Sequence, residues 1–190
     1  MTSTSVTLLE RVRNPRDGRA WREFFRLYFP VLKKYARRRG LAASEADDIA
    51  QDCMESLAEH MPGFCYSPGR GRFKSYLRTM VDNRIANRRR RKHMRQARTG
   101  ELEALPAGEA ARQAWDEVWL REHLAYSIAR LESRCSNDTV NAFRLYALQD
   151  WPVEKVCAAL GLSANQVYLA KSRMIRRLRQ ELAALVGDVL

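Results

Sequence analysis

The sequence predicts an all-α fold in which two helical domains are joined by a flexible linker, with a helix-turn-helix in the C-terminal domain. Apolar residues recur at three- and four-residue spacing along most of the 190 residues, and only nine Gly and six Pro interrupt them. This periodicity is lost between residues 96 and 113. Near the C-terminus, a Gly-containing turn separates a short helical segment from a longer basic one.

The N-terminal domain is predicted to span residues 20–95, after a tail of residues 1–19. Its first helix covers residues 20–39 and ends at Gly40. The apolar stripe of this helix is expected to form the core and consists of Trp21, Phe24, Phe25, Tyr28, Leu32 and Tyr35. Because Pro30 lies inside the stretch, a kinked helix and two shorter helices are both compatible with the pattern.

The second helix of this domain is acidic on its exposed face. We expect it to begin with Ser44 as N-cap and to end before Pro62 and Gly63. Its buried positions are Ala46, Ile49, Cys53 and Leu57. Residues 64–72 are expected to form a loop, and a third helix over residues 73–95 becomes strongly cationic from Arg84 onward.

The C-terminal domain is predicted over residues 114–190, after a linker of residues 96–113. Its apolar pattern begins with Trp115 and Trp119, and a further helix extends to residue 148. A short helix over residues 152–160, a turn at Gly161 and a long final helix follow. Ser163 is the predicted N-cap of the final helix, with Gln166 as its capping-box partner.

The formal net charge of +12 indicates a polyanionic partner, either nucleic acid or an anionic membrane. No apolar run reaches the roughly 18 residues that a membrane-spanning helix needs, and residues 1–17 lack the apolar core of a signal peptide. We therefore expect a cytoplasmic protein without membrane insertion. Residues 40–69 carry six acids and no Lys or Arg, whereas residues 84–98 carry eight Lys or Arg and no acid. This separation predicts two different partner surfaces.

No catalytic residue, cofactor or metal site is predicted. The four cysteines, Cys53, Cys65, Cys135 and Cys157, form no Cys-x-x-Cys pair, and the three histidines share no ligand spacing. Buried, reduced thiols are expected at the apolar helix positions of Cys53 and Cys157. Because hydrolytic and phosphate-cradling motifs are also missing from the sequence, we do not expect an enzyme.

The C-terminal pattern predicts a DNA-reading helix. With Val167, Met174 and Leu178 facing inward, the outward stripe carries hydrogen-bonding groups near the start of the helix and cations farther along, as base and phosphate contacts require. This stripe comprises Asn165, Tyr168, Leu169, Ser172, Arg173 and Arg176. The alternative is a solvated basic helix end without a role in binding.

Aromatic and cationic side chains also cluster in and beside the loop of residues 64–72. Phe64, Tyr66, Phe73 and Tyr76, close to the basic run, form the combination that binds unstacked bases of single-stranded nucleic acid. Phe64 and Phe73 are equally consistent with core positions. The cations of residues 88–92 surround most of the helix circumference and are expected to bind phosphates without reading sequence.

Taken together, these segments resemble the sigma-70 family of bacterial transcription initiation factors, in its extracytoplasmic-function group. Residues 45–52, Glu-Ala-Asp-Asp-Ile-Ala-Gln-Asp, are similar to the Asp-Ala-Glu-Asp-Leu-Val-Gln-Glu signature of region 2. Residues 73–83 are similar to its Phe-x-x-Trp-Leu stretch that ends in Asn, with Tyr76 in place of Trp. Residues 167–179 resemble the recognition helix of region 4.

The resemblance implies a non-catalytic subunit that binds core RNA polymerase, recognises the −35 and −10 promoter elements and promotes DNA melting. The implied partners are the polymerase, through the clamp helices of its largest subunit and its flap, promoter DNA, and an anti-sigma factor or other regulator. The residues implied for core binding are Asp47, Asp48, Gln51 and Asp52. Those implied for the −10 element and melting are Tyr66, Arg72, Phe73, Tyr76, Asn83, Arg84, Arg88 and Arg89. Those implied for the −35 element are Gln166, Tyr168, Leu169, Ser172, Arg173 and Arg176.

Asp82 departs from this pattern, because an acid is not expected beside a DNA contact such as Asn83. Two other classes of function are also considered. A stand-alone helix-turn-helix repressor or activator would need symmetric dimerisation and leaves the acidic helix unexplained. An RNA-binding protein would use the arginine run, but the sequence offers no catalytic residues for RNA processing.

Overall fold

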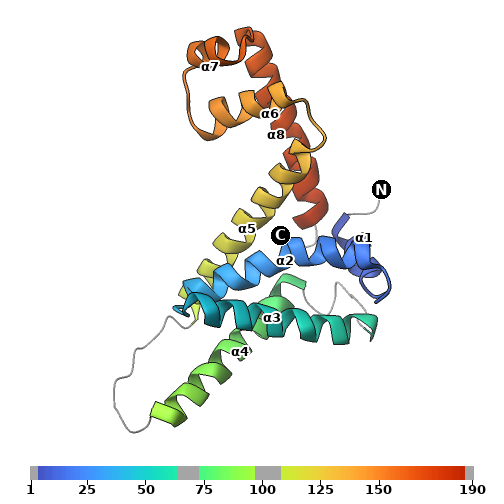
Figure 1. Cartoon of the computed structure of the whole chain (residues 1–190), viewed down its shortest axis with the longest axis vertical. Helices are drawn as coiled ribbons and strands as arrows, with labels where there is room; N and C mark the ends of the chain where they lie inside the picture. Colours follow the sequence, from blue (N-terminus) through green and yellow to red (C-terminus); the bar gives the residue numbers. More distant parts are fainter. Residues whose placement is uncertain (1–3, 64–72, 97–107, 187–190) are drawn as a thin grey trace. The chain divides into compact units, whose positions relative to one another are not determined.

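The computed structural model describes residues 4–63, 73–96 and 108–186, which form helices and short turns without any strand (Figure 1). Side chains are described for residues 8–63, 73–94 and 108–183. The chain divides into two compact units between Glu122 and His123. The predicted all-α fold with two domains is therefore confirmed. None of the described helices has the combination of length and apolar character that crossing a membrane requires.

The N-terminal unit is built on three long helices, α2 (Gly18–Arg38), α3 (Ala43–His60) and α4 (Phe73–Gln96). Helices α2 and α3 lie side by side, and α4 packs against both (Figure 1). Helix α2 is continuous through Pro30, so the alternative of two shorter helices is excluded. A single 3-10 turn, η1 (Met61–Gly63), follows α3.

The start of the chain differs from the expected tail, because helix α1 (Thr4–Arg11) forms there. Leu8, Leu9 and Val12 are buried, which gives this short segment an apolar face that docks it on the unit. Asp17 then caps α2 by accepting a hydrogen bond from the backbone N–H of Ala20 at 2.9 Å. This bond, together with Arg11, holds the pKa of Asp17 below its usual value.

The predicted N-cap of α3 at Ser44 is wrong. The helix begins at Ala43, and the Glu45 carboxylate accepts a hydrogen bond from the backbone N–H of Ala42 at 3.1 Å. Because that hydrogen bond stabilises the charged form, it lowers the pKa of Glu45. The glutamate at the third helical position thus satisfies the backbone donor of the cap residue, whereas Ser44 lies inside the helix.

Helix α5 (Glu109–Glu132) contains the division between the two units, which was expected in the linker of residues 96–113. The reason is aromatic packing within the N-terminal unit. Trp115 and Trp119 are 1% and 2% exposed. The Trp115 ring lies 4.9 Å from that of Tyr35, and the Trp119 ring lies 5.8 Å from that of Tyr28, both on α2. Residues 109–122 therefore belong to the N-terminal unit.

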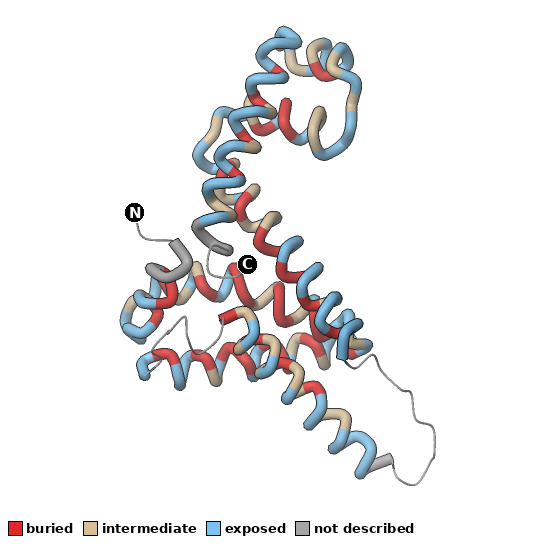
Figure 2. The backbone as a smooth tube through the Cα atoms, turned by 180° about the vertical axis from the view of Figure 1, so that it is seen from behind, coloured by how far each residue is buried: buried red, intermediate tan, exposed pale blue. Residues whose placement is uncertain are grey.

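The C-terminal unit continues with α6 (Asn137–Phe143), η3 (Arg144–Leu148), α7 (Val153–Leu160) and α8 (Ala164–Val186). The expected helix up to residue 148 is α6 followed by the π-helical turn η3. Val156 of α7 and Val167 of α8 are fully buried in one cluster with Ala142 and Ala170, as a helix-turn-helix requires. Buried positions recur at three- and four-residue intervals along the helices (Figure 2).

The turn between α7 and α8 has the predicted chemistry. Gly161 has a φ of 66°, in the left-handed region, and its N–H donates to the carbonyl of Cys157 at 2.9 Å. The Ser163 N–H donates to Gln166 Oε1 at 2.8 Å, and the Gln166 N–H donates to Ser163 Oγ at 3.3 Å. The capping box is therefore confirmed, and the start of α8 is fixed relative to α7.

We expect Gly161→Ala to lower the free energy of unfolding by about 1 kcal/mol, because a Cβ atom disfavours the left-handed backbone conformation. Gly18→Ala is the matched control: its added Cβ meets only the end of the Arg22 side chain at 3.5 Å, and its φ lies outside the strained region. Urea denaturation followed by circular dichroism measures both variants. Equal stability of the two variants would contradict the turn geometry.

Candidate functional site

The acidic residues predicted to bind a partner lie together on α3. Asp48, Gln51 and Asp52 are exposed, and Asp47 is half exposed. The spacing of three and four residues places them along one side of the helix. The Asp47 carboxylate lies 2.7 Å from Lys33 Nζ, and Asp48 lies 3.1 Å from Arg88. Among the described residues, the ion pairs of this set involve Asp47 and Asp48 but not Asp52. Gln51 is uncharged and forms a hydrogen bond with Glu55.

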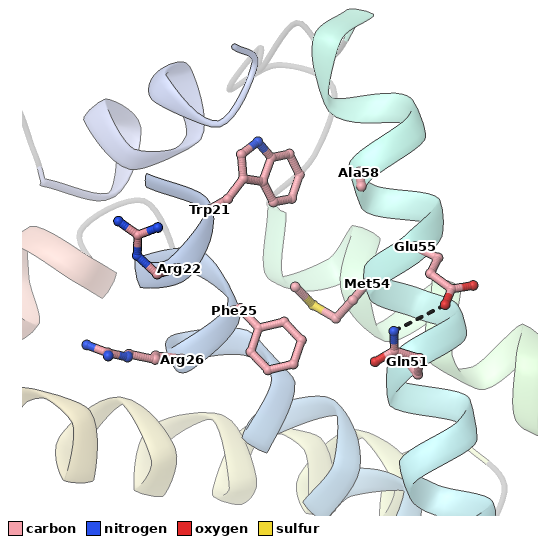
Figure 3. Close-up of a pocket in the computed structure, with 8 residues that line it drawn as sticks. All are labelled: Trp21, Arg22, Phe25, Arg26, Gln51, Met54, Glu55 and Ala58. Atoms are coloured by element: carbon pink, nitrogen blue, oxygen red, sulfur yellow. Dashed lines mark hydrogen bonds between the residues drawn. The ribbon is translucent and has the colours of Figure 1, made fainter. Parts of the chain in front are cut away.

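An apolar groove adjoins the acidic residues. It has a volume of about 450 Å³ and lies between α2 and α3, with Trp21, Phe25 and Met54 facing it (Figure 3). Gln51 and Glu55, which are hydrogen-bonded at 3.1 Å, form the rim on α3. Phe25 was predicted to be a core residue, but it is 41% exposed because it lies on the side of α2 that faces this groove.

The cations of α4 that were assigned to DNA are held by the protein itself. Arg88 pairs with Glu45 at 3.5 Å and with Asp48 at 3.1 Å. Arg84 donates to the carbonyl of Asp52 at 3.2 Å and to the Ser56 hydroxyl. Arg89 donates to a backbone carbonyl of α2's C-terminal end, that of Arg39. These arginines thus connect α4 to α2 and α3, whereas Arg91 and Lys92 are exposed.

Asp82 has a structural role that explains its departure from the expected pattern. Its carboxylate accepts a hydrogen bond from the Tyr35 hydroxyl at 2.9 Å and pairs with Arg39, whose side chain is 11% exposed. Tyr35 is fully buried, and burial raises its pKa to about 12. The neighbouring Asn83 is exposed. Asp82 therefore joins α2 to α4 while Asn83 stays available to a partner.

The residues predicted to stack on bases differ in how far they are buried. Phe73 is 5% exposed, with its ring 5.3 Å from that of Tyr28 and 6.0 Å from that of Phe24. Phe73 is thus a core residue in this conformation, which corrects its assignment to a base-stacking surface. Tyr76 is half buried, and burial raises its pKa. Tyr66 and Arg72 lie outside the described residues.

The residues of α8 that were predicted to read DNA lie on the surface of the helix. All six residues assigned to the upstream element are exposed, namely Gln166, Tyr168, Leu169, Ser172, Arg173 and Arg176. Val167, Met174 and Leu178 face inward, with exposed fractions of at most 7%. The start of α6 borders this face, because Ser136 and Thr139 line a cleft of about 350 Å³ together with Leu169 and Arg173. The helix therefore presents a continuous polar and cationic surface with two apolar side chains in it.

The two thiols predicted to be buried, those of Cys53 and Cys157, lie in apolar surroundings. Cys53 is buried, and burial raises its pKa to about 12, so it stays a protonated thiol at neutral pH. Cys157 is half buried in the helix-turn-helix core. Within the described ranges, no three His, Cys, Asp or Glu side chains are grouped as a metal site would require.

Sequence reasoning missed the groove and the contacts of α5. Trp21 and Phe25 fit the helical period of the core, and the period alone does not distinguish the centre of a buried stripe from its edge. Likewise, Lys74 pairs with Asp116 of α5 at 2.6 Å, a contact between residues 42 positions apart. A pattern that is local in sequence carries no information about such a pair.

Comparison with known proteins finds a matching family model and similar proteins. Residues 24–95, which cover most of α2 and all of α3 and nearly all of α4, match the family model of sigma-70 region 2. The ECF RNA polymerase sigma factor RpoE of Cereibacter sphaeroides is 29% identical over 79 residues, which are 42% of this chain and 42% of that protein. The match thus spans less than half the length of this relative. The structure of CnrH in complex with the cytosolic domain of CnrY aligns with 95% of this chain and 98% of its own, with 18% identity and a TM-score of 0.39.

The N-terminal unit is thus similar to sigma-70 region 2 over residues 24–95. Part of the chain is also similar to an extracytoplasmic-function sigma factor.

We expect Asp82→Ala to lower the free energy of unfolding by about 1–3 kcal/mol, because it removes the carboxylate that Arg39 and the Tyr35 hydroxyl share. The Tyr35 hydroxyl is then left with the longer bond to the Ala111 carbonyl at 3.4 Å. Asn83→Ala on the exposed side of α4 is the control and should leave stability unchanged. Thermal or urea unfolding compares the two. If both variants unfold alike, the network does not join α2 to α4.

Proposed function

We propose that this chain is a promoter-specificity subunit of RNA polymerase. It binds the core enzyme, recognises the −35 and −10 promoter elements and promotes melting of the DNA. The observation that carries the proposal is the match of residues 24–95 to sigma-70 region 2, in a unit whose acidic helix α3 has exposed Asp48, Gln51 and Asp52. As a sigma-type subunit it is non-catalytic, and the polymerase supplies the chemistry.

The core-binding surface in this proposal is the acidic side of α3. Carboxylate and amide groups attract and orient a cationic partner, and the clamp helices of the largest polymerase subunit are the proposed partner. The neighbouring groove adds apolar contacts from Trp21 and Phe25, since Gln51 belongs to both. A polar rim beside an apolar floor is the composition expected of a specific protein interface.

In the proposed mechanism, melting is driven by the binding of unpaired bases rather than by a covalent step. Extruding a base costs a few kcal/mol, which stacking and phosphate contacts must offset. Tyr76, Asn83 and the α4 cations are the described residues proposed for this role, with Tyr66 and Arg72 of the loop. Phe73 is not included, because it is buried in the core.

The C-terminal unit is proposed to anchor on duplex DNA at the upstream element. Arg173 provides a donor pair suited to guanine or phosphate, and Leu169 provides apolar contact with a thymine methyl group. The flap of the polymerase and an anti-sigma factor or other regulator are further proposed partners. A dimeric repressor with the same helix-turn-helix would bind duplex DNA but would not need the acidic face of α3.

The combined variant Asp48→Ala/Gln51→Ala should bind core RNA polymerase about tenfold more weakly, because it removes two exposed polar groups from the centre of the proposed interface. Glu59→Ala, an exposed carboxylate on the same helix, is the control. Affinity is measured with labelled core enzyme, and activity is measured by specific run-off transcription. If the chain supports no run-off transcript and the two variants bind core enzyme equally, the proposed function as a promoter-specificity subunit is incorrect.

Leu169→Ser should change the preferred base at one position of the upstream element, since it replaces an apolar contact by a hydrogen-bonding one. The expected discrimination against the original base is about 1 kcal/mol or more. Selection of bound duplexes from a randomised promoter library measures the preference. An unchanged selected sequence would mean that Leu169 does not contact a base.

A further inference from the structure

The start of α5 covers a surface of the N-terminal unit that carries both cations and aromatic rings. We call residues 109–122 the cover segment, and Tyr28, Lys34, Tyr35, Arg38 and Lys74 the covered face. Three of the five residues are cationic, and two present aromatic rings to Trp115 and Trp119. Cations beside aromatic faces are the combination that binds single-stranded nucleic acid.

Each cation of the covered face is paired with a carboxylate of the cover segment. Lys74 Nζ lies 2.6 Å from Asp116, and Lys34 Nζ lies 2.8 Å from Glu122. Arg38 pairs with Glu117. Three carboxylates of the cover segment thus occupy three cations from two other helices, as phosphates of a nucleic acid strand would do.

The aromatic rings of the cover segment take the positions that bases would take. The Trp119 ring contacts Tyr28 at 5.8 Å between centroids, and Lys74 Nζ lies 5.8 Å from the centre of the same Trp119 ring. Trp115 meets Tyr35 edge to face at 4.9 Å. A planar ring against an aromatic side chain, with a cation beside it, is the contact that an unstacked base makes.

The ion-paired edge of the contact is incompletely packed. A cleft of about 230 Å³ lies there, between Lys34 and Arg38 of α2 and Glu117 and Glu122 of α5. Arg38 and Glu117 are both 49% exposed. Ion pairs that are this accessible to water contribute little to stability, so this edge can separate more readily than the aromatic side of the contact.

We propose that the covered face is a binding surface for single-stranded nucleic acid and that the cover segment occupies it until the strand displaces it. This inference rests on the proposed function only for the choice of nucleic acid as the partner. Because Lys74 follows Phe73 directly, displacement of the cover segment also exposes the start of α4, where the proposed base-capture residues begin.

The test removes the three carboxylates of the cover segment without changing their shape, in Asp116→Asn/Glu117→Gln/Glu122→Gln. The control variant, Glu10→Gln/Glu55→Gln/Glu59→Gln, has the same change in net charge at exposed positions of the same unit outside the cover segment. The probe is a fluorescein-labelled oligothymidine, whose binding to the full chain is followed by anisotropy at low salt. This measurement needs neither a promoter nor the polymerase.

We expect the cover variant to bind oligothymidine at least about fivefold more tightly than the control variant. The apparent dissociation constant falls as the fraction of uncovered protein rises, and that fraction rises mainly through the two pairs that are partly buried, Lys34–Glu122 and Lys74–Asp116. Adding Lys34→Gln/Arg38→Gln/Lys74→Gln should abolish the gain, whereas Arg13→Gln/Arg16→Gln/Arg19→Gln should not. Equal affinities of the cover and control variants, or no binding by the cover variant, overturn the proposal.

A second measurement follows the cover segment itself. In a Trp21→Phe/Trp151→Phe background, the fluorescence comes from Trp115 and Trp119 alone. Saturating oligothymidine should shift their emission to longer wavelength, because displacement moves two buried indoles into water. Binding without a shift overturns the proposal. The run-off assay decides the proposed sigma function separately, so either conclusion can fail while the other stands.

Discussion

The packing of two tryptophans of α5 against two tyrosines of α2 determines how this chain divides. Trp115 and Trp119 are almost fully buried against Tyr35 and Tyr28. The start of α5 therefore belongs to the N-terminal unit, and the division falls within a helix.

The same unit uses its own carboxylates and carbonyls to hold a strongly cationic helix in place. Arg84, Arg88 and Arg89 of α4 all reach acceptors on α2 or α3 or directly after α2. Asp82 completes this arrangement from α4 by accepting from Tyr35 and Arg39. The acidic helix α3 therefore serves two purposes, since Glu45 and Asp48 neutralise Arg88 while Gln51 and Asp52 remain on the surface.

The elements that depend on local periodicity were predictable from the sequence, and the contacts between distant residues were not. Hydrophobic spacing predicted α2, α3, α4 and the inward positions Val167, Met174 and Leu178, because a helical period determines a face. It could not predict which partner covers that face. For this reason Trp115 was assigned to the wrong unit, Phe73 remained undecided between core and surface, and the pairing of Asp82 with Arg39, 43 residues away, was not foreseen. The Ser44 error has a different origin, since Glu45 provides an equivalent hydrogen bond from a different position.

The two proposed DNA surfaces differ in how far their side chains are ordered before binding. The reading residues of α8 are exposed, so a duplex must order long side chains such as Arg173 and Arg176 as it binds, at a cost in conformational entropy. The arginines of α4 have already lost that freedom, because internal hydrogen bonds hold them. A strand that binds α4 therefore incurs less of this entropic cost but must compete with the internal acceptors. This competition weakens binding to arbitrary nucleic acid and favours a ligand whose phosphates and bases engage several of these groups at once. A surface of this kind suits a subunit that must ignore most of the DNA it meets.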